Sequence, residues 1–360
     1  MKNILIRVMI TAFAVIMLAL TASAATDTDG YTLITTPEEF LAIADDLSGD
    51  YRLANNIDFT DVEYTVIGSM SEPFTGNLDG ANYSVIGITI DAESESEDVY
   101  AAAFAYNKGT ITDIAFDGAL ISADSPENVY VAAVAAVNEG VIEGISVTGA
   151  TVTATSQYKA VRAAGITAYN LENGVVENSS AGASIEASAT RLYADAAGIV
   201  AVNLGEVTSV YTYGEIDVTA SSDALAGGIV SSNYGTVTDA ENENTVKASS
   251  AKGYAMAGGI CGRSESETTG CTNNGYAYVN GILVDATVRY GDVNSDGVVN
   301  VIDLIILARY NANWTGYDNT VVNVLAANVD GDAEVGTRDV TILARHIAAW
   351  AGYETLPYKN

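Results

Sequence analysis

The sequence predicts a mainly β chain, a right-handed β-solenoid of about six coils of about 30 residues with an N-terminal cap, followed by a small all-α domain. One phrase of residues returns six times between Tyr100 and Val279, which is typical of stacked structural repeats. Apolar and polar residues alternate within the copies, as in half-buried strands. A loop followed by a helix occurs twice near the C-terminus. The predicted domains are a signal peptide at 1–24, a cap and first coil at 25–98, the repeats at 99–285 and the all-α domain at 286–360.

The N-terminus has the three-part pattern of a secretory signal peptide. Lys2 and Arg7 are basic, Val8 to Leu20 is an unbroken apolar run, and Ala22 to Ala24 supplies small residues for cleavage. The run of thirteen residues is shorter than a typical membrane span, although an uncleaved anchor is the alternative interpretation. We expect a mature chain that begins near Ala25, is secreted and contains no membrane span after cleavage.

The composition narrows the class of partner. The chain has 15 basic and 46 acidic residues and a formal net charge of −31, so it repels nucleic acid and acidic polymers. Hydrophobic residues make up 49% of the chain, which argues against disorder. The two cysteines, Cys261 and Cys271, either form a disulfide or stand as thiols in adjacent strands; their spacing does not decide between these.

Residues Tyr31 to Asp58 predict a cap for one end of the solenoid, where unpaired strand edges would otherwise be exposed. Thr36 to Glu39 (Thr-Pro-Glu-Glu) has the form of a capping box with proline at the first helical position. Phe40, Ile43 and Leu47 then fall on one helical face. Short strands are expected nearby at Tyr51–Leu53 and Ser84–Ile90.

The repeated phrase is a run of small apolar residues that ends in asparagine and is followed by a turn glycine. Each copy predicts three short strands, as in the alternating segments Thr110–Phe116 and Glu206–Tyr211. Asparagine and glycine tolerate the positive φ of tight turns, and the small inward residues suit a narrow interior. The runs end, 30 to 33 residues apart, at Asn107, Asn138, Asn170, Asn203, Asn233 and Ser264.

These repeats resemble the bacterial repeats named for their G-L-U-G motif. The resemblance is carried by AGGIVSSNYGTVTDA (Ala226 to Ala240) and its copies, and by FTGNLDGANYSVIGITI (Phe74 to Ile90) as a first coil. It covers roughly Tyr31 to Val284 and implies a β-solenoid of a surface or secreted protein. It implies almost nothing about activity.

The duplicated C-terminal pattern predicts calcium sites. Calcium prefers several oxygen ligands on a flexible loop, at positions 1, 3, 5, 7, 9 and 12 around a glycine at position 6. The first copy has Gly297 at position 6, and we expect it to bind calcium well. Its candidate ligands are Asp292, Asn294, Asp296, the carbonyl of Val298, Asn300 and Asp303.

The second copy, 36 residues later, departs from this pattern. Ala333 occupies position 6, where positive φ is unfavourable, and Gly336 at position 9 offers no side-chain oxygen. We therefore expect two calcium sites, of which the second is weaker. Its candidate ligands are Asn328, Asp330, Asp332, the carbonyl of Glu334 and Asp339.

This C-terminal segment resembles a type I dockerin, the module that binds cohesin domains on the scaffoldins of cellulosomes. The resemblance rests on aspartate at position 12, one helix after each loop, and the matched triplets Leu307–Arg309 and Leu343–Arg345. It implies cohesin contacts through loop positions 10 and 11 and the following helix face. Core packing of Ile302 and a solvated face for the arginines are the alternatives. The residues so implied are Val301, Ile302, Ala308, Arg309, Thr337, Arg338, Ala344 and Arg345.

The same resemblance implies a secreted component of an extracellular polysaccharide-degrading complex, with plant cell-wall polysaccharide as a candidate partner. No catalytic set stands out in the solenoid, so we favour a binding or structural module over a hydrolase or lyase on the β-helix. The single histidine, His346, is expected on an exposed face of a dockerin helix. Arg162 and Asp195 are interpreted as turn residues beside the apolar runs.

Tyrosines near the start of the apolar runs offer a second functional hypothesis. Aligned on one face, they would form a platform for sugar rings; the alternative is a ladder that only packs the turns. A spacer or adhesive surface without a ligand is a third possibility. The tyrosines are Tyr100, Tyr130, Tyr158, Tyr193 and Tyr254.

Overall fold

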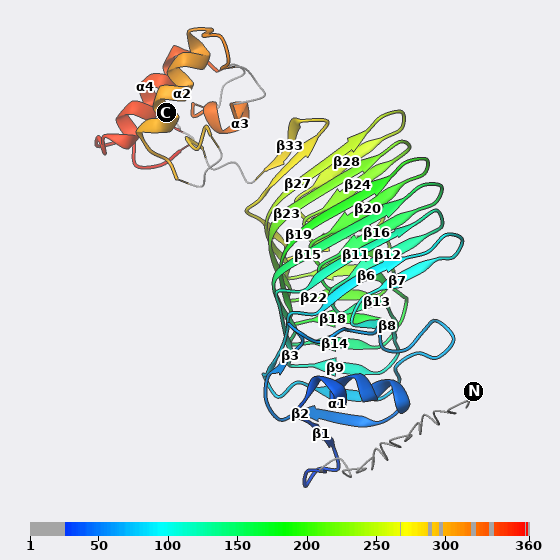
Figure 1. Cartoon of the computed structure of the whole chain (residues 1–360). Helices are drawn as coiled ribbons and strands as arrows, with labels where there is room; N and C mark the ends of the chain where they lie inside the picture. The colour runs from blue at the N-terminus through cyan, green and yellow to red at the C-terminus, as the bar shows by residue number, and fades with distance from the viewer. Residues whose placement is uncertain are drawn as a thin grey trace, which may run out of the picture.

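The computed structural model describes residues 26–266, 268–286, 290–294, 298–317, 322–330, 335–356 and 358, and the predicted signal peptide lies outside these ranges. The fold is mainly β, with a β-solenoid of about 7 turns and a C-terminal helical region (Figure 1), which confirms the predicted fold class. Among the described residues, no helix is both long and apolar enough to cross a bilayer.

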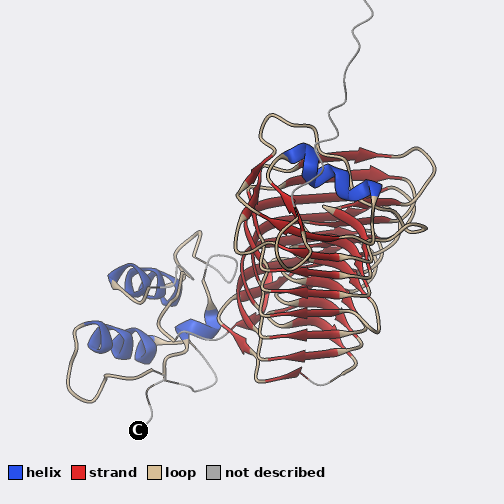
Figure 2. Ribbon diagram, turned by 90° about the horizontal axis from the view of Figure 1, so that it is seen from below, coloured by secondary structure: helices blue, strands red, loops and turns tan. Residues whose placement is uncertain are grey.

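The N-terminal cap contains a short helix at the predicted place. The helix α1 (Pro37–Leu41) is capped by Thr36, whose hydroxyl accepts a hydrogen bond from the backbone N–H of Glu39 at 3.2 Å. It continues as the 3₁₀ turn η1 (Ala42–Asp45). Phe40 and Ile43 are completely buried, so this segment covers one end of the solenoid core (Figure 2).

The solenoid consists of four sheets in which strands of successive coils pair in parallel and in register. The first sheet contains β1 (Thr32–Ile34), β2 (Asp50–Leu53), β4 (Asn77–Asp79), β9 (Thr110–Thr112), β14 (Val141–Glu143), β18 (Val175–Glu177), β22 (Glu206–Thr208), β26 (Thr236–Thr238) and β30 (Thr268–Thr269). The second contains β3 (Ile57–Asp58), β5 (Ser84–Ile86), β6 (Thr89–Glu93), β10 (Ala115–Asp117), β11 (Leu120–Ser125), β15 (Ser146–Ser156), β19 (Ser180–Ala189), β23 (Tyr211–Ala220), β27 (Glu241–Ser250), β31 (Thr272–Asn273), β32 (Tyr276–Val279) and β33 (Ile282–Ala286).

The other two sheets have six strands each. We name them after their terminal strands. The β7–β28 sheet contains β7 (Val99–Ala101), β12 (Val129–Ala132), β16 (Val161–Ala164), β20 (Ala194–Ala197), β24 (Ala224–Gly227) and β28 (Ala255–Gly258). The β8–β29 sheet contains β8 (Phe104–Asn107), β13 (Ala135–Asn138), β17 (Thr167–Asn170), β21 (Val200–Asn203), β25 (Val230–Asn233) and β29 (Cys261–Ser264).

A regular coil therefore has four strands, and the predicted three strands are wrong in this detail. The small apolar run bends in its middle, as at Ala133 and Val134 between β12 and β13, and so supplies two strands instead of one. Small alanines on the outer side of this bend pack against one another, separately from the main core. The bend thus makes a concave outer surface between the β7–β28 and β8–β29 sheets, which we call the valley. Its fully buried alanines are Ala102, Ala132, Ala136 and Ala168.

A ladder of buried asparagines joins the coils at the end of each apolar run. Each side-chain amide donates one hydrogen bond to the next asparagine and one to a turn carbonyl, such as Gly140 O at 3.1 Å for Asn138. The Nδ2 to Oδ1 distances are 2.8 Å from Asn107 to Asn138, 2.8 Å from Asn138 to Asn170, 2.9 Å from Asn170 to Asn203 and 2.9 Å from Asn203 to Asn233. The ladder ends where Asn233 donates to the Ser264 hydroxyl at 3.1 Å.

The glycine after each asparagine is required by close packing rather than by positive φ. A Cβ atom on Gly140 would lie 2.1 Å from the carbonyl oxygen of Gly109 in the preceding coil. Positive φ occurs instead at the following corner, where Asp113, Asn178 and Ser209 adopt φ between 49° and 54°.

The C-terminal end of the solenoid differs from the regular coils. Strand β33 pairs with β32 in antiparallel orientation, which ends the parallel stacking. Cys261 and Cys271 are both free thiols, and burial raises the pKa of the Cys261 thiol to about 12. The structure therefore favours free thiols over a disulfide, although only Cys261 lies in a strand, β29, and Cys271 stands between β30 and β31.

The helical region has a small core of its own. Its helices are α2 (Val301–Asn311), α3 (Val324–Ala327) and α4 (Thr337–Ile347). The core contains the completely buried side chains of Leu307 and Leu343, one from each duplicated helix. The remaining buried apolar residues of this cluster are Val293, Val322, Ala327, Val329 and Ile342.

The asparagine ladder generates a stability prediction. Replacing Asn170 with alanine leaves the buried donor of Asn138 and the buried acceptor of Asn203 without their ladder partners, and should destabilise the solenoid by about 2–3 kcal/mol. Asn274→Ala is the control, because the exposed side chain of Asn274 donates a hydrogen bond to the carboxylate of Glu241 and stands outside the ladder; it should cost less than about 0.5 kcal/mol. Urea denaturation at saturating calcium measures both, and equal losses would contradict a structural role for the ladder.

Candidate functional site

The first duplicated loop is organised by a buried carboxylate. Asp303 is completely buried at the start of α2. Its Oδ1 accepts hydrogen bonds from the N–H groups of Val293 at 2.8 Å and Asn294 at 3.2 Å, and its Oδ2 accepts one from Asn300 at 2.8 Å. One side chain thereby ties the beginning of the loop to its end.

Other candidate ligands surround this carboxylate. Asp292 is completely buried and lies close enough to raise the pKa of Asp303 further, although burial of Asp303 is the main cause of that rise. The amide oxygen of Asn300 accepts from Ile302 N at 2.7 Å, while its Nδ2 donates to the carbonyl of Val298 at 3.1 Å. Asp296, predicted at position 5, lies outside the described residues.

The second loop repeats the arrangement with one addition. Asp339, also buried, accepts from Asp330 N at 3.1 Å and Gly336 N at 2.7 Å, and burial raises its pKa. The Nε of Arg338 lies 3.3 Å from Oδ2 of Asp330, whose side chain is 1% exposed. The positive charge of Arg338 thus lies beside Asp330, a candidate ligand of this loop. The equivalent position in the first loop is the uncharged Ile302. Asn328 is described, whereas Asp332 and Glu334 lie outside the described residues.

The donor sets fit a calcium ion. The side chains that converge on each loop are carboxylates and amides, the ligands of a hard cation, and burial disfavours the charged form of Asp303 and Asp339 unless a cation compensates it. Within the described ranges, no group of three or more His, Cys, Asp or Glu side chains gathers as a metal site, and the middle of both loops falls outside those ranges. Asp303 and Asp339 would hold the ion at position 12 of each loop.

An aromatic clasp, which the sequence analysis missed, follows each of the two loop-bearing helices. The guanidinium of Arg309 lies 5.4 Å from the ring centroid of Trp314 and 5.2 Å from that of Tyr317. Arg345 lies 5.5 Å from Trp350 and 5.1 Å from Tyr353. The signal was present in the sequence as Trp-x-Gly-Tyr, repeated at the same 36-residue spacing. The two arginines are half-buried in these clasps rather than on a solvated face.

The remaining predicted contact residues lie on the outside of the module. Val301 is 56% and Ile302 51% exposed, so the core-packing alternative for Ile302 is wrong. Ile305, one turn further along α2, is 44% exposed and extends this apolar surface. Thr337 and Arg338 are exposed at the equivalent place on α4, and Ala308 and Ala344 are partly exposed.

His346 takes a different position from the one expected. It is only partly exposed on α4, and its Nδ1 lies 2.7 Å from the carbonyl oxygen of Tyr353. It therefore helps to hold the segment after α4 and is not a free surface group.

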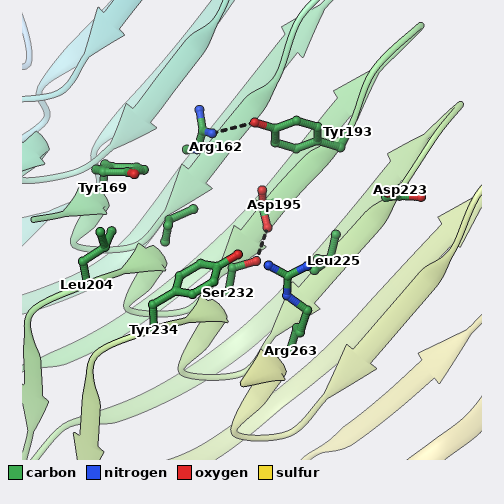
Figure 3. A pocket seen from close by; sticks show the side chains of 11 residues that line it. Arg162, Tyr169, Tyr193, Asp195, Leu204, Asp223, Leu225, Ser232, Tyr234 and Arg263 are labelled. Carbon is green, nitrogen blue, oxygen red and sulfur yellow. Dashed lines mark hydrogen bonds between the residues drawn. The ribbon is translucent and has the colours of Figure 1, made fainter. Parts of the chain in front are cut away.

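The valley of the solenoid contains a pocket of about 500 Å³. In the β7–β28 sheet, one outward-facing position is repeated in register from strand to strand. Tyr100 and Tyr130 occupy this position first, and their rings stack. The pocket opens beyond them, where Arg162, Asp195 and Leu225 take the same position. The wall opposite comes from the β8–β29 sheet and the turn after it (Figure 3). The pocket is lined by Arg162, Tyr169, Tyr193, Asp195, Val202, Leu204, Asp223, Leu225, Ser232, Tyr234 and Arg263.

Arg162 and Asp195 are strand residues, so their interpretation as turn residues is wrong. They are register partners in β16 and β20 and face outward into the concave valley, and Asp195 is therefore only 4% exposed. Its Oδ1 accepts hydrogen bonds from the hydroxyls of Ser231 at 3.0 Å and Ser232 at 2.8 Å. Burial raises the pKa of Asp195, while the serine bonds and the charge of Arg162 oppose that rise.

Arg162 is held by aromatic rings. Its guanidinium lies 5.1 to 5.5 Å from the ring centroids of Tyr130, Tyr169 and Tyr193, and its Nη2 donates to the Tyr193 hydroxyl at 2.8 Å. Its Nε is buried and has no acceptor within hydrogen-bond distance among the described residues. The guanidinium of Arg162 is thus held in one orientation, and its Nε–H can still donate a hydrogen bond.

The predicted tyrosine platform forms only in part. Tyr100 and Tyr130 stack with their ring centroids 4.8 Å apart and an interplanar angle of 6°. Tyr193 instead bonds Arg162, and Tyr158 lies under Arg191, 4.7 Å from its guanidinium. Tyr254 is 73% exposed at the last coils. The tyrosines therefore do not form one continuous row.

Comparison with protein families identifies the C-terminal module. Residues 290–348 match the model of the Dockerin type I domain, which confirms the resemblance drawn from the loops. Type I dockerin domains bind calcium, and a dockerin implies a cohesin partner. No curated protein matches the chain. The likeness of the solenoid to G-L-U-G repeats stays a prediction.

Two solved structures are similar to part of this chain. One, from Bacteroides ovatus and proposed to be an immunoglobulin A1 protease, has 16% identity and a TM-score of 0.52 over 73% of this chain and 81% of its own. Another, an IgA1 protease, has 15% identity and a TM-score of 0.37 over 68% of this chain and 21% of its own. At 16% identity, the likeness to the first of these structures concerns the fold alone.

The loop geometry predicts that the dockerin helices depend on calcium. The core is small, and the buried aspartates need a compensating cation, so far-ultraviolet circular dichroism of residues 286–360 should show helix loss after chelation and recovery when calcium is restored. The matched position-1 variants should differ, with Asp292→Ala shifting the calcium midpoint further than Asn328→Ala. Helicity that is unchanged by chelation would contradict the prediction.

Proposed function

We propose that the chain is a secreted component of an extracellular polysaccharide-degrading complex of the cellulosome type. Its dockerin binds a cohesin domain of a scaffoldin in a calcium-dependent way, and its solenoid is the attached binding or structural module. The observation that carries this proposal is the match of residues 290–348 to the dockerin family. This segment contains the two loops, and the aspartate at position 12 of each loop is buried and accepts hydrogen bonds from the backbone of that loop.

The proposed calcium ligands are the described residues Asp292, Asn294, Val298, Asn300 and Asp303 in the first loop, with Asp296 completing the set. The second site uses Asn328, Asp330 and Asp339 together with Asp332 and Glu334. Arg338 supports the expectation that this second site is weaker, because its guanidinium lies 3.3 Å from the Asp330 carboxylate and competes with a bound cation for that charge.

The cohesin-facing surface is proposed to centre on the N-terminal end of α2. Val301, Ile302 and Ile305 expose 44 to 56% of their surface and form an apolar patch next to the first loop. Such a patch on a small module favours a partner surface, since apolar anchors carry much of the affinity of an interface. Arg309 and Arg345 act indirectly in this proposal, because the clasps hold them beside the helices and leave Ala308 and Ala344 as the small residues a partner can approach.

The two halves of the dockerin present different chemistry at the same place. Val301 and Ile302 are apolar, whereas Thr337 and Arg338 are polar, and Arg338 is tied to Asp330. A cohesin surface that fits one pair would bury an unmatched charge or leave an unfilled apolar site against the other. We therefore expect one binding orientation, with α2 toward the cohesin.

Alanine replacement of each pair tests this orientation. Val301→Ala with Ile302→Ala should weaken cohesin binding by about 10- to 100-fold, which corresponds to about 1.4 kcal/mol per tenfold. Thr337→Ala with Arg338→Ala is the matched control and should change the affinity by less than about threefold. Surface plasmon resonance at saturating calcium with the cohesins of candidate scaffoldins gives the affinities. Equal effects of the two pairs, or a loss only when all four are replaced, would show interchangeable faces.

The alternative function is a polysaccharide-cleaving enzyme on the β-helix. The observation in its favour is a valley pocket that holds a buried carboxylate beside two arginines. Incubating residues 25–285 with pectin, xylan and cellulose, followed by assays of reducing ends and unsaturated products, tests it. We expect no robust turnover; turnover that Asp195→Asn abolishes would replace the binding-module proposal with the enzymatic one.

A further inference from the structure

The valley pocket is the feature of the solenoid that the repeat pattern does not account for. Regular coils place small alanines or stacked tyrosines in the valley, as Ala102, Ala132 and the pair Tyr100 and Tyr130 do. Over the next coils the column carries Arg162 and Asp195, and the opposite wall recedes to Val202 and Ser232. The cavity arises because these side chains do not fill the space that the tyrosines fill.

We propose that this pocket binds a neutral carbohydrate through neighbouring hydroxyl groups. The proposal rests on the binding-module half of the proposed function and is independent of cohesin docking. The site includes Tyr193 of the predicted tyrosine platform but centres on Arg162 and Asp195.

The polar groups of the pocket are complementary to a sugar hydroxyl. Asp195 offers carboxylate oxygen held by Ser231 and Ser232, and a hydroxyl can donate to such an acceptor. Arg162 and Arg263 offer donors, and the Nε of Arg162 has no acceptor among the described residues. Figure 3 shows Asp195 between these two arginines, so one ligand can meet an acceptor and donors on adjacent atoms. Sugars present hydroxyls in this adjacent arrangement.

The apolar part of the pocket fits the other surface of a sugar ring. Val202 and Leu225 are each 6% exposed and form an apolar floor of the pocket. Tyr169 and Tyr234 contribute aromatic rings to its wall. Sugar rings have C–H faces that pack on such surfaces. The volume of about 500 Å³ lies within the range of about 300–1,000 Å³ of small-molecule sites and accommodates more than one ring.

The overall charge favours a neutral ligand over an acidic one. Within the pocket, the formal charges of Asp195 and Asp223 are balanced by those of Arg162 and Arg263. The chain as a whole carries a net charge of −31, which opposes the approach of an acidic glycan, whereas a neutral one meets no such repulsion.

The test is isothermal titration calorimetry of the mature full-length chain at saturating calcium with cellotetraose, xylotetraose, mannotetraose and tetragalacturonate. We expect at least one neutral tetrasaccharide to bind and tetragalacturonate to bind more weakly. Arg162→Gln should weaken the neutral ligand about 10- to 100-fold, since a hydrogen bond to a charged group is lost. The absence of binding by all three neutral probes, or tighter binding of tetragalacturonate, would overturn the proposal.

Rim variants keep the test informative if Arg162→Gln fails to fold. Tyr234 is 40% exposed, and Arg263 lies over its ring at 5.3 Å, so Tyr234→Ala and Arg263→Gln remove pocket groups at the surface. The matched control is the pair Tyr158→Ala and Arg191→Gln, which has the same ring and guanidinium contact at 4.7 Å but lies outside the pocket. Rim variants should weaken binding at least about tenfold and control variants less than about twofold. Equal effects would place the sugar elsewhere and reject the pocket.

A cohesin capture assay on the same variants separates the two proposals. The pocket variants should bind cohesin as the unmodified chain does. A chain that binds sugar but no cohesin would contradict only the docking proposal, and one that binds cohesin but no sugar would contradict only the pocket.

Discussion

The constraint on which the solenoid depends is that every coil stacks on the next in register. Parallel pairing satisfies the backbone along the sheets, and at the corners the buried asparagines add hydrogen bonds to turn carbonyls and to one another. A chain of side-chain amides works only if each coil presents an asparagine at the same place. The asparagine corner therefore constrains the repeat length as much as the strands do. The adjoining glycine is required because the coils approach each other too closely there for a Cβ atom.

In-register stacking also explains how a uniform scaffold can carry a local site. Each outward position becomes a column along the rod, so a change of residue type in one or two coils changes one stretch of the surface and leaves the core intact. In the valley, the change from stacked tyrosines to Arg162 and Asp195 opens a cavity without disturbing the inward alanines and valines of the same strands. Buried polar groups then stand on rigid strands, which is a favourable support for ligand recognition.

The dockerin is stabilised differently, because its apolar core is too small to supply most of its stability. Aspartates at position 12 fold each loop back onto the start of its helix, and their burial creates a demand for positive charge. In the proposed function, calcium compensates the buried aspartate of the first loop. In the second loop, the guanidinium of Arg338 provides part of the positive charge beside Asp330. After each helix, an arginine packs between a tryptophan and a tyrosine. The two halves are thus alike in scaffold and unlike in the chemistry they present.

The sequence by itself determined the repeat, the cap and the loops, because these depend on local patterns. Thr36 caps its helix, the runs ending in asparagine stack, and the C-terminal segment is a dockerin, all as predicted. Only the tertiary structure decided that the apolar run bends and that the coil has four strands. Alternation along a strand separates its two faces but does not show which outer face is concave, so Asp195 in β20 could not be recognised as buried. The same limit hid the clasps around Arg309 and Arg345, because contact between a helix and the turn after it depends on how the chain folds back, and sequence spacing alone does not specify that geometry.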